Sequence, residues 1–205
     1  MAAAREASIG LAPTALQRGY PGATRADKKL ARRVTVLPSR RMKLEGSCHC
    51  RAVRFSVESA EPVPFMRCYC SICRKTAGGG GYAINLGADF STLKVTGRRH
   101  LRVYRARMDD ADPPRTSSAQ RHFCGRCGSA LWLYDPTWPG LVHPHASAID
   151  TPLPNPPENV HLMLGSKAPW VAVEGRPNDP RYDAYPDFSL AEWHAERGLT
   201  SETDD

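Results

Sequence analysis

The stretch Cys68-Tyr69-Cys70-Ser71-Ile72-Cys73 decides how this chain is organised. It places three cysteines within six residues, in the pattern C-x-C-x-x-C. Thiolates are soft ligands that zinc binds readily, usually in a tetrahedral set of four. Three thiolates supply one ligand too few. Either a distant residue completes the set, or one coordination position stays open to a substrate, as it does in catalytic zinc sites.

The other four cysteines form two pairs that flank this triad. Cys48 and Cys50 make a C-x-C, and Cys124 and Cys127 make a C-x-x-C. Together the two pairs supply a complete set of four thiolates, so the seven cysteines divide into four and three without remainder. We therefore predict two Zn²⁺ ions per chain. The rival interpretation is three disulfides and one free thiol, but no secretory signal indicates an oxidising compartment.

The four-thiolate set predicts a structural zinc. Cys50 and Cys124 are separated by 73 residues, and a metal that binds only the folded form offsets the entropic cost of closing such a loop. A full set of four thiolates leaves no position for a substrate. The triad could instead hold a catalytic zinc, since a coordinated thiol loses its proton and becomes a nucleophile at neutral pH.

The alternative for the triad is that a histidine closes the site and makes it structural as well. Three cysteines and one histidine are a common structural set, and spacing alone does not decide between the two. The chain offers seven candidates: His49, His100, His122, His143, His145, His161 and His194.

Length and charge limit the classes of function. The 205 residues predict one domain with extensions, and no apolar run reaches the 18 residues of a membrane span. The net charge of +7 lies wholly in residues 1–41, and the remainder carries equal numbers of acidic and basic side chains. A nucleic-acid partner for the cysteine-bearing body is therefore not indicated.

The chain divides into three parts. Residues 1–41 form a basic leader, which could be a disordered arm, an organelle transit peptide, or an over-extended gene start ahead of Met42. Residues 42–175 form the zinc domain, and residues 176–205 a C-terminal extension. We expect a cytoplasmic protein, or an organellar one if the leader is a transit peptide.

The zinc domain is expected to be mainly β. Alternating or continuous apolar residues predict strands at 52–57, 82–86, 93–96, 100–104, 130–134, 160–164 and 169–173. Residues 108–118 are expected to be a solvated loop. Seven prolines between residues 135 and 159 argue against a central strand there. Ser189, Glu192 and Gly198 predict one short C-terminal helix. The glycine run at 78–81 reads as a plain loop, a flexible lip beside the metal, or a close approach by a ligand.

These motifs resemble a known family. The sequence is similar to the glutathione-dependent formaldehyde-activating (GFA) family, which also includes centromere protein V. The similar segments are Gly46–Phe55, Cys68–Lys75, Phe123–Ser129, Val160–Leu162 and Ala168–Val171. Arg51 departs from the family, which usually has glycine there, as does the proline-rich insert at 135–159. Residues 1–41 have no counterpart in it.

The resemblance implies a β-tent fold, with two antiparallel sheets around two zinc sites. It implies that Cys48, Cys50, Cys124 and Cys127 hold the structural zinc, and that Cys68, Cys70 and Cys73 hold the catalytic one. The implied activity is that of a carbon–sulfur lyase, S-(hydroxymethyl)glutathione synthase-like, acting on a small thiol such as glutathione and a small aldehyde. Arg74, Lys75 or Arg126 could meet the carboxylates of such a thiol.

Two other classes of function compete with the lyase. One is a non-catalytic zinc-binding module that recognises a protein or a nucleic acid. The other is a thiol redox enzyme, which would need a cysteine not bound to metal. None of the seven cysteines is spare.

Overall fold

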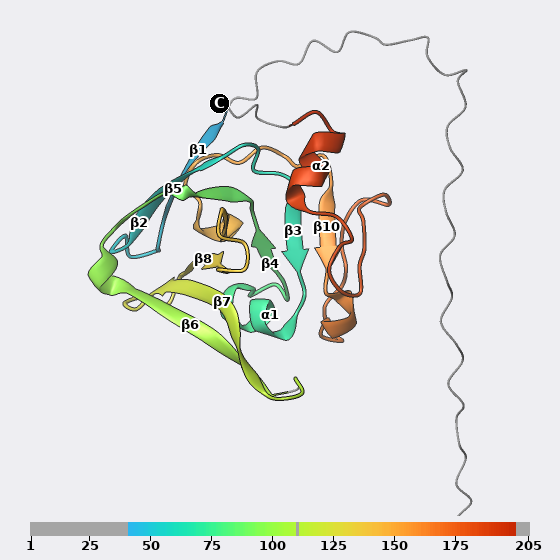
Figure 1. Cartoon of the computed structure of the whole chain (residues 1–205), viewed down its shortest axis with the longest axis horizontal. Helices are drawn as coiled ribbons and strands as arrows, with labels where there is room; N and C mark the ends of the chain where they lie inside the picture. Colours follow the sequence, from blue (N-terminus) through green and yellow to red (C-terminus); the bar gives the residue numbers. More distant parts are fainter. Residues whose placement is uncertain (1–40, 110, 200–205) are drawn as a thin grey trace, which may run out of the picture. The chain divides into compact units, whose positions relative to one another are not determined.

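The part of the chain that the structure describes folds into two β-sheets and two short α-helices (Figure 1). The computed structural model describes residues 41–109 and 111–199. The large sheet has seven strands, and every neighbouring pair is antiparallel. In spatial order they are β1 (Met42–Ser47), β2 (Arg54–Ser59), β5 (Ala88–Thr96), β9 (Leu141–Pro144), β8 (Ala130–Tyr134), β7 (Arg115–Cys124) and β6 (Leu101–Met108).

The small sheet has three strands and lies beside the large one in Figure 1. Its order is β10 (Asn159–Leu162), β3 (Phe65–Cys68) and β4 (Ala83–Asn85). The sheet is mixed, because β10 pairs parallel with β3 whereas β4 pairs antiparallel with it. The expectation of two purely antiparallel sheets therefore holds only for the large sheet.

The helices lie at two places on the small sheet. α1 (Ser71–Ala77) follows β3 directly, and α2 (Leu190–Glu196) lies close to the start of β3. His194 of α2 bonds to the carbonyl oxygen of Val63 at 2.6 Å. Single 3₁₀ turns occupy Arg98–His100, Ala146–Ala148 and Leu164–Ser166. None of the helices in residues 41–109 and 111–199 has the length and apolar character needed to cross a bilayer.

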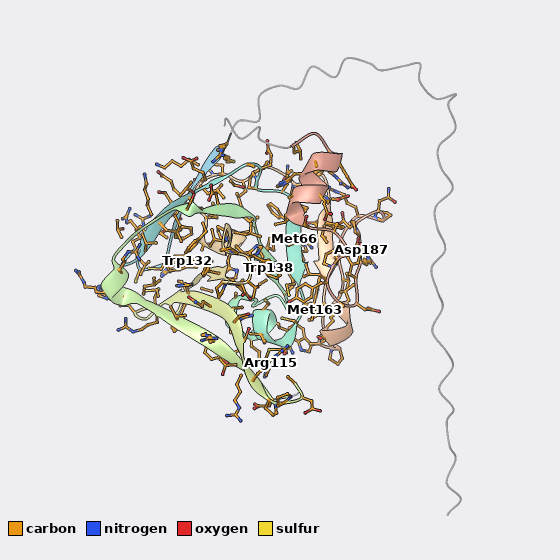
Figure 2. All side chains as sticks on the ribbon, in the orientation of Figure 1. Met66, Arg115, Trp132, Trp138, Met163 and Asp187 are labelled. Atoms are coloured by element: carbon orange, nitrogen blue, oxygen red, sulfur yellow. The ribbon has the colours of Figure 1, made fainter. Side chains whose placement is uncertain are left out.

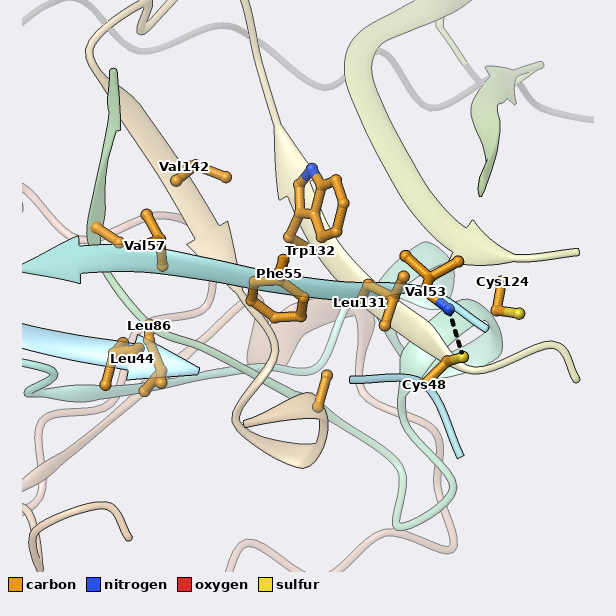
Figure 3. Packing of buried hydrophobic residues seen from close by; sticks show 12 residues of the cluster. Leu44, Cys48, Val53, Phe55, Val57, Leu86, Cys124, Leu131, Trp132 and Val142 are labelled. Atoms are coloured by element: carbon orange, nitrogen blue, oxygen red, sulfur yellow. Dashed lines mark hydrogen bonds between the residues drawn. The ribbon is translucent and has the colours of Figure 1, made fainter. Parts of the chain in front are cut away.

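The main core lies on one face of the large sheet and ends at a pair of cysteines (Figure 3). Phe55 of β2 packs edge-on against Trp132 of β8, with ring centroids 5.1 Å apart. Figure 3 shows Val53 beside Cys48 and Cys124 at one end of this cluster. Both cysteines are fully buried. The four-cysteine set is thus continuous with the core.

Most of the expected elements are confirmed. The fold is mainly β, and the strands expected around residues 52–57, 82–86, 93–96, 100–104, 130–134 and 160–164 appear as β2, β4, β5, β6, β8 and β10. The C-terminal helix is α2. Its capping box joins the Ser189 side chain to the Glu192 backbone N–H, and the Glu192 carboxylate to the Ser189 N–H.

The expectation for the proline-rich segment was wrong. β9 is a central strand that pairs with both β5 and β8. Only four residues long, it contains no proline before its last residue, Pro144. Because Pro144 is the last residue of the strand, its missing N–H falls at the strand end, and its carbonyl oxygen still accepts the Leu86 N–H at 2.9 Å.

Three further differences concern local structure. Residues 169–173 form turns and irregular backbone rather than a strand, and β7 begins at Arg115, inside the expected loop 108–118. Helix α1 was not expected. The leader, apart from Arg41, lies outside the described residues, so the predicted division into three parts stays a prediction.

Candidate metal centres

Two tight turns bring Cys48, Cys50, Cys124 and Cys127 together. The Cys48 carbonyl accepts the Arg51 N–H at 2.8 Å, and the Cys124 carbonyl accepts the Gly128 N–H at the same distance. The Sγ atoms of Cys48 and Cys50 are 3.6 Å apart, and those of Cys50 and Cys124 are 3.8 Å apart. All four sulfur atoms lie within 4.8 Å of one another. Tetrahedral zinc with Zn–S bonds of about 2.3 Å places its sulfur atoms about 3.8 Å apart, so this donor set fits zinc.

Hydrogen-bond donors surround these sulfur atoms as they would surround thiolates. The Val53 N–H donates to Cys48 Sγ at 3.2 Å, and the Arg126 N–H to Cys124 Sγ at 3.4 Å. Ser129 Oγ lies 3.2 Å from Cys127 Sγ. This contact, followed by backbone donors, lowers the pKa of Cys127 to about 5. The site therefore favours the charged sulfur that a metal requires.

The departure at Arg51 has a structural meaning. Arg51 has φ = 57°, in the left-handed region that a side chain disfavours. It closes the turn that carries Cys48 and Cys50. A glycine would fit this position without strain.

The triad comes from the junction of β3 and α1. Cys68 ends β3, Cys70 is the N-cap of α1, and Cys73 lies in its first turn. The Cys73 N–H donates to Cys70 Sγ at 3.3 Å. The three sulfur atoms lie within 4.8 Å of one another, and Cys68 and Cys73 are buried. Met66 and Met163, labelled in Figure 2, pack against this cluster.

The three thiols share their protons unequally. Contacts with Cys68 and then Cys73 lower the pKa of Cys70 to about 2. Contacts with Cys70 and Cys73, followed by burial, raise the pKa of Cys68 far above its usual value. The contacts thus favour a thiolate at Cys70, with two further sulfur atoms beside it. This arrangement suits a soft divalent cation.

No histidine joins the triad. All seven histidines are among the described residues, and none of the histidine, aspartate or glutamate side chains there comes within 4.8 Å of all three sulfur atoms. Five of the rings have hydrogen-bond partners elsewhere, at 2.6–3.0 Å, and the partner of His100 is the Arg99 Nε–H. The partners of His143, His145, His161 and His194 are the Leu86 carbonyl, the Asn85 side chain, the Tyr69 hydroxyl and the Val63 carbonyl, respectively. Within the described residues, the protein offers this site three ligands.

Arg121 is a buried cation that acts on the triad, and the sequence did not single it out. It lies on β7, opposite Leu133 of β8, and is only 9% exposed. Within the described residues its side chain makes one long hydrogen bond, 3.5 Å to the Ala119 carbonyl, and no carboxylate lies within 4.0 Å. The Cys68 contact and, more weakly, the Arg121 charge lower the pKa of Cys73, although the Cys70 contact and burial raise it overall to about 11.

Tyr185 is close enough to the triad for the cysteine charges to act on its phenol. Burial, followed by the charges of Cys68, Cys70 and Cys73, raises the pKa of its phenol, while Arg121 lowers it. The Tyr185 side chain is nevertheless two-thirds exposed, at 67%. The raised pKa keeps this exposed phenol protonated.

The glycine run after α1 is partly packed and partly free. A Cβ on Gly78 would stand 2.4 Å from the Tyr82 carbonyl oxygen, and one on Gly81 would stand 2.3 Å from a Val171 methyl. Gly79 and Gly80 have no atom within 4 Å of such a position. Packing thus requires glycine at positions 78 and 81, whereas Gly79 and Gly80 form an open part of the loop.

The basic residues proposed from sequence are distributed differently. Arg74 and Lys75 lie on α1, in its last turn. Arg126 lies on the four-sulfur turn instead. Burial and then the charges of Arg99, Arg126 and Arg102 lower the pKa of His100, so these arginines gather around that ring.

Comparison with known proteins identifies the family. The sequence model of the family described as glutathione-dependent formaldehyde-activating enzyme matches residues 43–164. A Halomonas elongata protein, provisionally named glutathione-dependent formaldehyde-activating enzyme, is 62% identical over 158 residues, which are 77% of this chain and 98% of that protein. The chain belongs to this family. All seven cysteines lie within the segment that the GFA family model matches.

A solved structure is also similar. It is a crystal structure of a Rhodobacter sphaeroides protein, 29% identical, with a TM-score of 0.43. The alignment covers 55% of this chain and 92% of that one.

Proposed function

We propose that this GFA-family protein is a zinc-dependent carbon–sulfur lyase acting on the adduct of a small thiol and a small aldehyde, such as S-hydroxymethylglutathione. The observation that carries the proposal is the set of Cys68, Cys70 and Cys73, with no fourth ligand from the described residues. Bound there, zinc would supply a Lewis acid that holds the substrate sulfur as a thiolate at neutral pH.

Arg121 is proposed to receive the negative charge of the substrate. A buried guanidinium with no carboxylate within 4.0 Å among the described residues is costly, and a substrate anion would offset that cost. Glutathione carries two carboxylates, and a charge-assisted hydrogen bond to one of them would fix its orientation. Gly79 and Gly80 leave room for a ligand backbone beside α1.

Tyr185 is proposed to serve the oxygen of the adduct. In the synthetic direction the thiolate sulfur forms a bond to the aldehyde carbon, and the carbonyl electron pair moves to oxygen, which takes up a proton. A protonated Tyr185 hydroxyl would donate a hydrogen bond to that oxygen. Cleavage of the adduct is the reverse of these movements.

Cys48, Cys50, Cys124 and Cys127 are proposed to hold a second, structural zinc. Their sulfur atoms form a complete donor set at the end of the main core. They join the start of the domain to the turn after β7.

Exchange NMR tests the proposal. The spectra report the rate at which formaldehyde and glutathione exchange with the S-hydroxymethyl adduct. Because the reaction also runs uncatalysed, the rate is compared rather than the yield. We expect the intact protein to accelerate exchange, and a folded Cys73→Ser variant to lose the acceleration. Arg126→Gln, which changes a basic residue at the other cysteine set, is the control and should retain it. No acceleration by intact protein would exclude this substrate pair and favour the non-catalytic binding module.

A further inference from the structure

A chain of buried polar side chains runs from the C-terminal segment to the back of the triad. Tyr69 lies between Cys68 and Cys70 in sequence. Its backbone N–H donates to the Leu162 carbonyl of β10 at 3.0 Å. Its side chain is fully buried and packs with Ala168 and Val171, away from the sulfur cluster.

The Tyr69 hydroxyl hydrogen-bonds to His161, and the Arg67 guanidinium lies near enough for its charge to act on the phenol. Tyr69 Oη lies 2.9 Å from His161 Nδ1, and the two rings are stacked with centroids 5.7 Å apart. His161 is the third residue of β10 and is also fully buried. Its register partner on β3 is Arg67, and the next pair is Leu162 with Cys68. The bond therefore crosses from one strand of the small sheet to the metal-binding end of its neighbour.

Asp179 faces the other side of the same imidazole. Its Oδ2 lies 3.7 Å from His161 Nε2, which is longer than a hydrogen bond. A carboxylate only accepts, so this contact favours a proton on Nε2 and leaves Nδ1 to accept from the Tyr69 hydroxyl. Asp179 is itself held by three donors at 2.9–3.0 Å: the Asn159 N–H, the Asn159 amide and the Arg176 N–H.

Gly175 shows how closely this chain is enclosed. A Cβ at this position would stand 2.6 Å from Asp179 Oδ2 and 2.8 Å from His161 Nε2. Only a glycine lets the backbone cover the contact between the two side chains. The backbone of β10 joins the same segment, because the His161 N–H donates to the Pro180 carbonyl at 2.9 Å and the Tyr182 N–H donates to the His161 carbonyl at 2.8 Å.

We infer that Asp179, His161 and Tyr69 form a positioning chain that fixes the triad from behind and sets how tightly it holds its metal. Tyr69 acts through the backbone of Cys68 and Cys70. If the hydroxyl lost its partner, the Tyr69 ring would be held by packing alone. The backbone that carries Cys68 and Cys70 could then shift, and the spacing of their sulfur atoms with it. Asp179 and Gly175 lie beyond residue 164, where the family match ends. The C-terminal segment thus completes a site whose ligands lie a hundred residues earlier in sequence.

The inference rests on the proposed function, since it assumes a metal at the triad. Outer partners that orient metal ligands typically change metal affinity by about 10- to 100-fold when removed. A purely structural role would instead lower the stability of the whole domain and weaken both cysteine sets. The separate affinities of the two sets therefore distinguish the two roles.

The test is a chelator competition on the zinc-loaded full chain. The zinc retained per chain is measured over a series of chelator concentrations, and each cysteine set is expected to release its zinc in a separate step. The release step that is missing in Cys73→Ser belongs to the triad. Tyr69→Phe removes only the hydroxyl, and Asp179→Asn removes only the charge. Tyr82→Phe is the matched control, because its ring packs 5.1 Å from that of Tyr69 and its hydroxyl has no hydrogen bond to another described residue.

We expect Tyr69→Phe and Asp179→Asn to release the triad zinc at about 10- to 100-fold lower chelator concentration, with the other step unchanged. Tyr82→Phe should match wild type. The absorption bands of the cobalt-loaded triad should also shift in Tyr69→Phe and not in Tyr82→Phe. Unchanged release in both variants, or equal weakening of both steps, would overturn the inference. If the wild-type triad holds no zinc, the proposed function fails and the inference falls with it. If the wild-type protein holds two zinc ions and both variants release the triad zinc as wild type does, the inference is wrong and the proposed function is unaffected.

Discussion

Loss of one thiolate should destabilise the domain far more at the four-sulfur set than at the triad. The matched variants are Cys127→Ser and Cys73→Ser. The first set closes a loop of 73 residues between Cys50 and Cys124, whereas the triad spans only the six residues that begin at Cys68. With the metal treated as a cross-link that is lost entirely when one thiolate is removed, loop-closure entropy contributes about 4.4 kcal/mol for the long loop and about 2 kcal/mol for the short one.

The difference of about 2.4 kcal/mol corresponds to roughly 5–10 °C in Tm for a domain of this size. Two further effects bear on it. The triad cysteines stay close together in the unfolded chain, so metal bound there stabilises the folded form less. Burial acts in the opposite direction, because Cys127 is exposed and Cys73 is only 5% exposed. Serine at Cys73 therefore carries a packing cost that serine at Cys127 does not, which makes the comparison conservative.

The assay is thermal unfolding by circular dichroism or calorimetry, with zinc per chain measured on the same samples. We expect Cys127→Ser to melt at least about 5 °C below Cys73→Ser. If Cys127→Ser melted at the same temperature as Cys73→Ser, or above it, the assignment of the structural role to the four-sulfur set would be refuted.

Three other predictions follow from single residues. Arg51→Gly should stabilise the domain by about 0.5–1 kcal/mol, because relief of the left-handed strain exceeds the added entropy of the unfolded chain; a lower Tm would contradict this reading of the turn. Gly97→Ala should cost about 1–3 kcal/mol more than Gly128→Ala in denaturant unfolding. Both glycines have φ near +73°, but only at Gly97 would a Cβ meet a backbone carbonyl oxygen, at 1.9 Å; equal costs would count against this. Arg121→Gln should lower kcat/KM with glutathione by about 10- to 100-fold, since it removes a charge-assisted bond, whereas Arg126→Gln should not; a smaller loss at Arg121 than at Arg126 would remove it from the substrate site.

The sequence predicted best what depends on spacing along the chain. The division of seven cysteines into four and three needed only their order and intervals, and the structure brings both groups together. The alternation of Val53, Phe55 and Val57 likewise predicted a strand, since one face of a half-buried strand is apolar. The capping box at Ser189 and Glu192 located the C-terminal helix.

Features that depend on tertiary contacts were not predictable from sequence. Helix α1 has only seven residues and a cysteine as its N-cap, which is no standard helix-start signal. β9 lies among prolines and gains its stability from strands on both sides. Nothing in the sequence marks Arg121 as buried, because its burial depends on the strands packed against β7. The bond from Tyr69 to His161 joins residues 92 positions apart.

The most direct test of the open triad is X-ray absorption at the zinc edge, with and without glutathione. The four-sulfur set is complete and offers no position for a thiol, so any change must come from Cys68, Cys70 and Cys73. We predict an average of about 3.5 sulfur ligands per zinc in the protein alone, rising to about 4 when glutathione binds. If the protein holds two zinc ions per chain and glutathione leaves the average number of sulfur ligands unchanged, the triad does not take up the thiol. That result would contradict the open zinc site proposed for the triad.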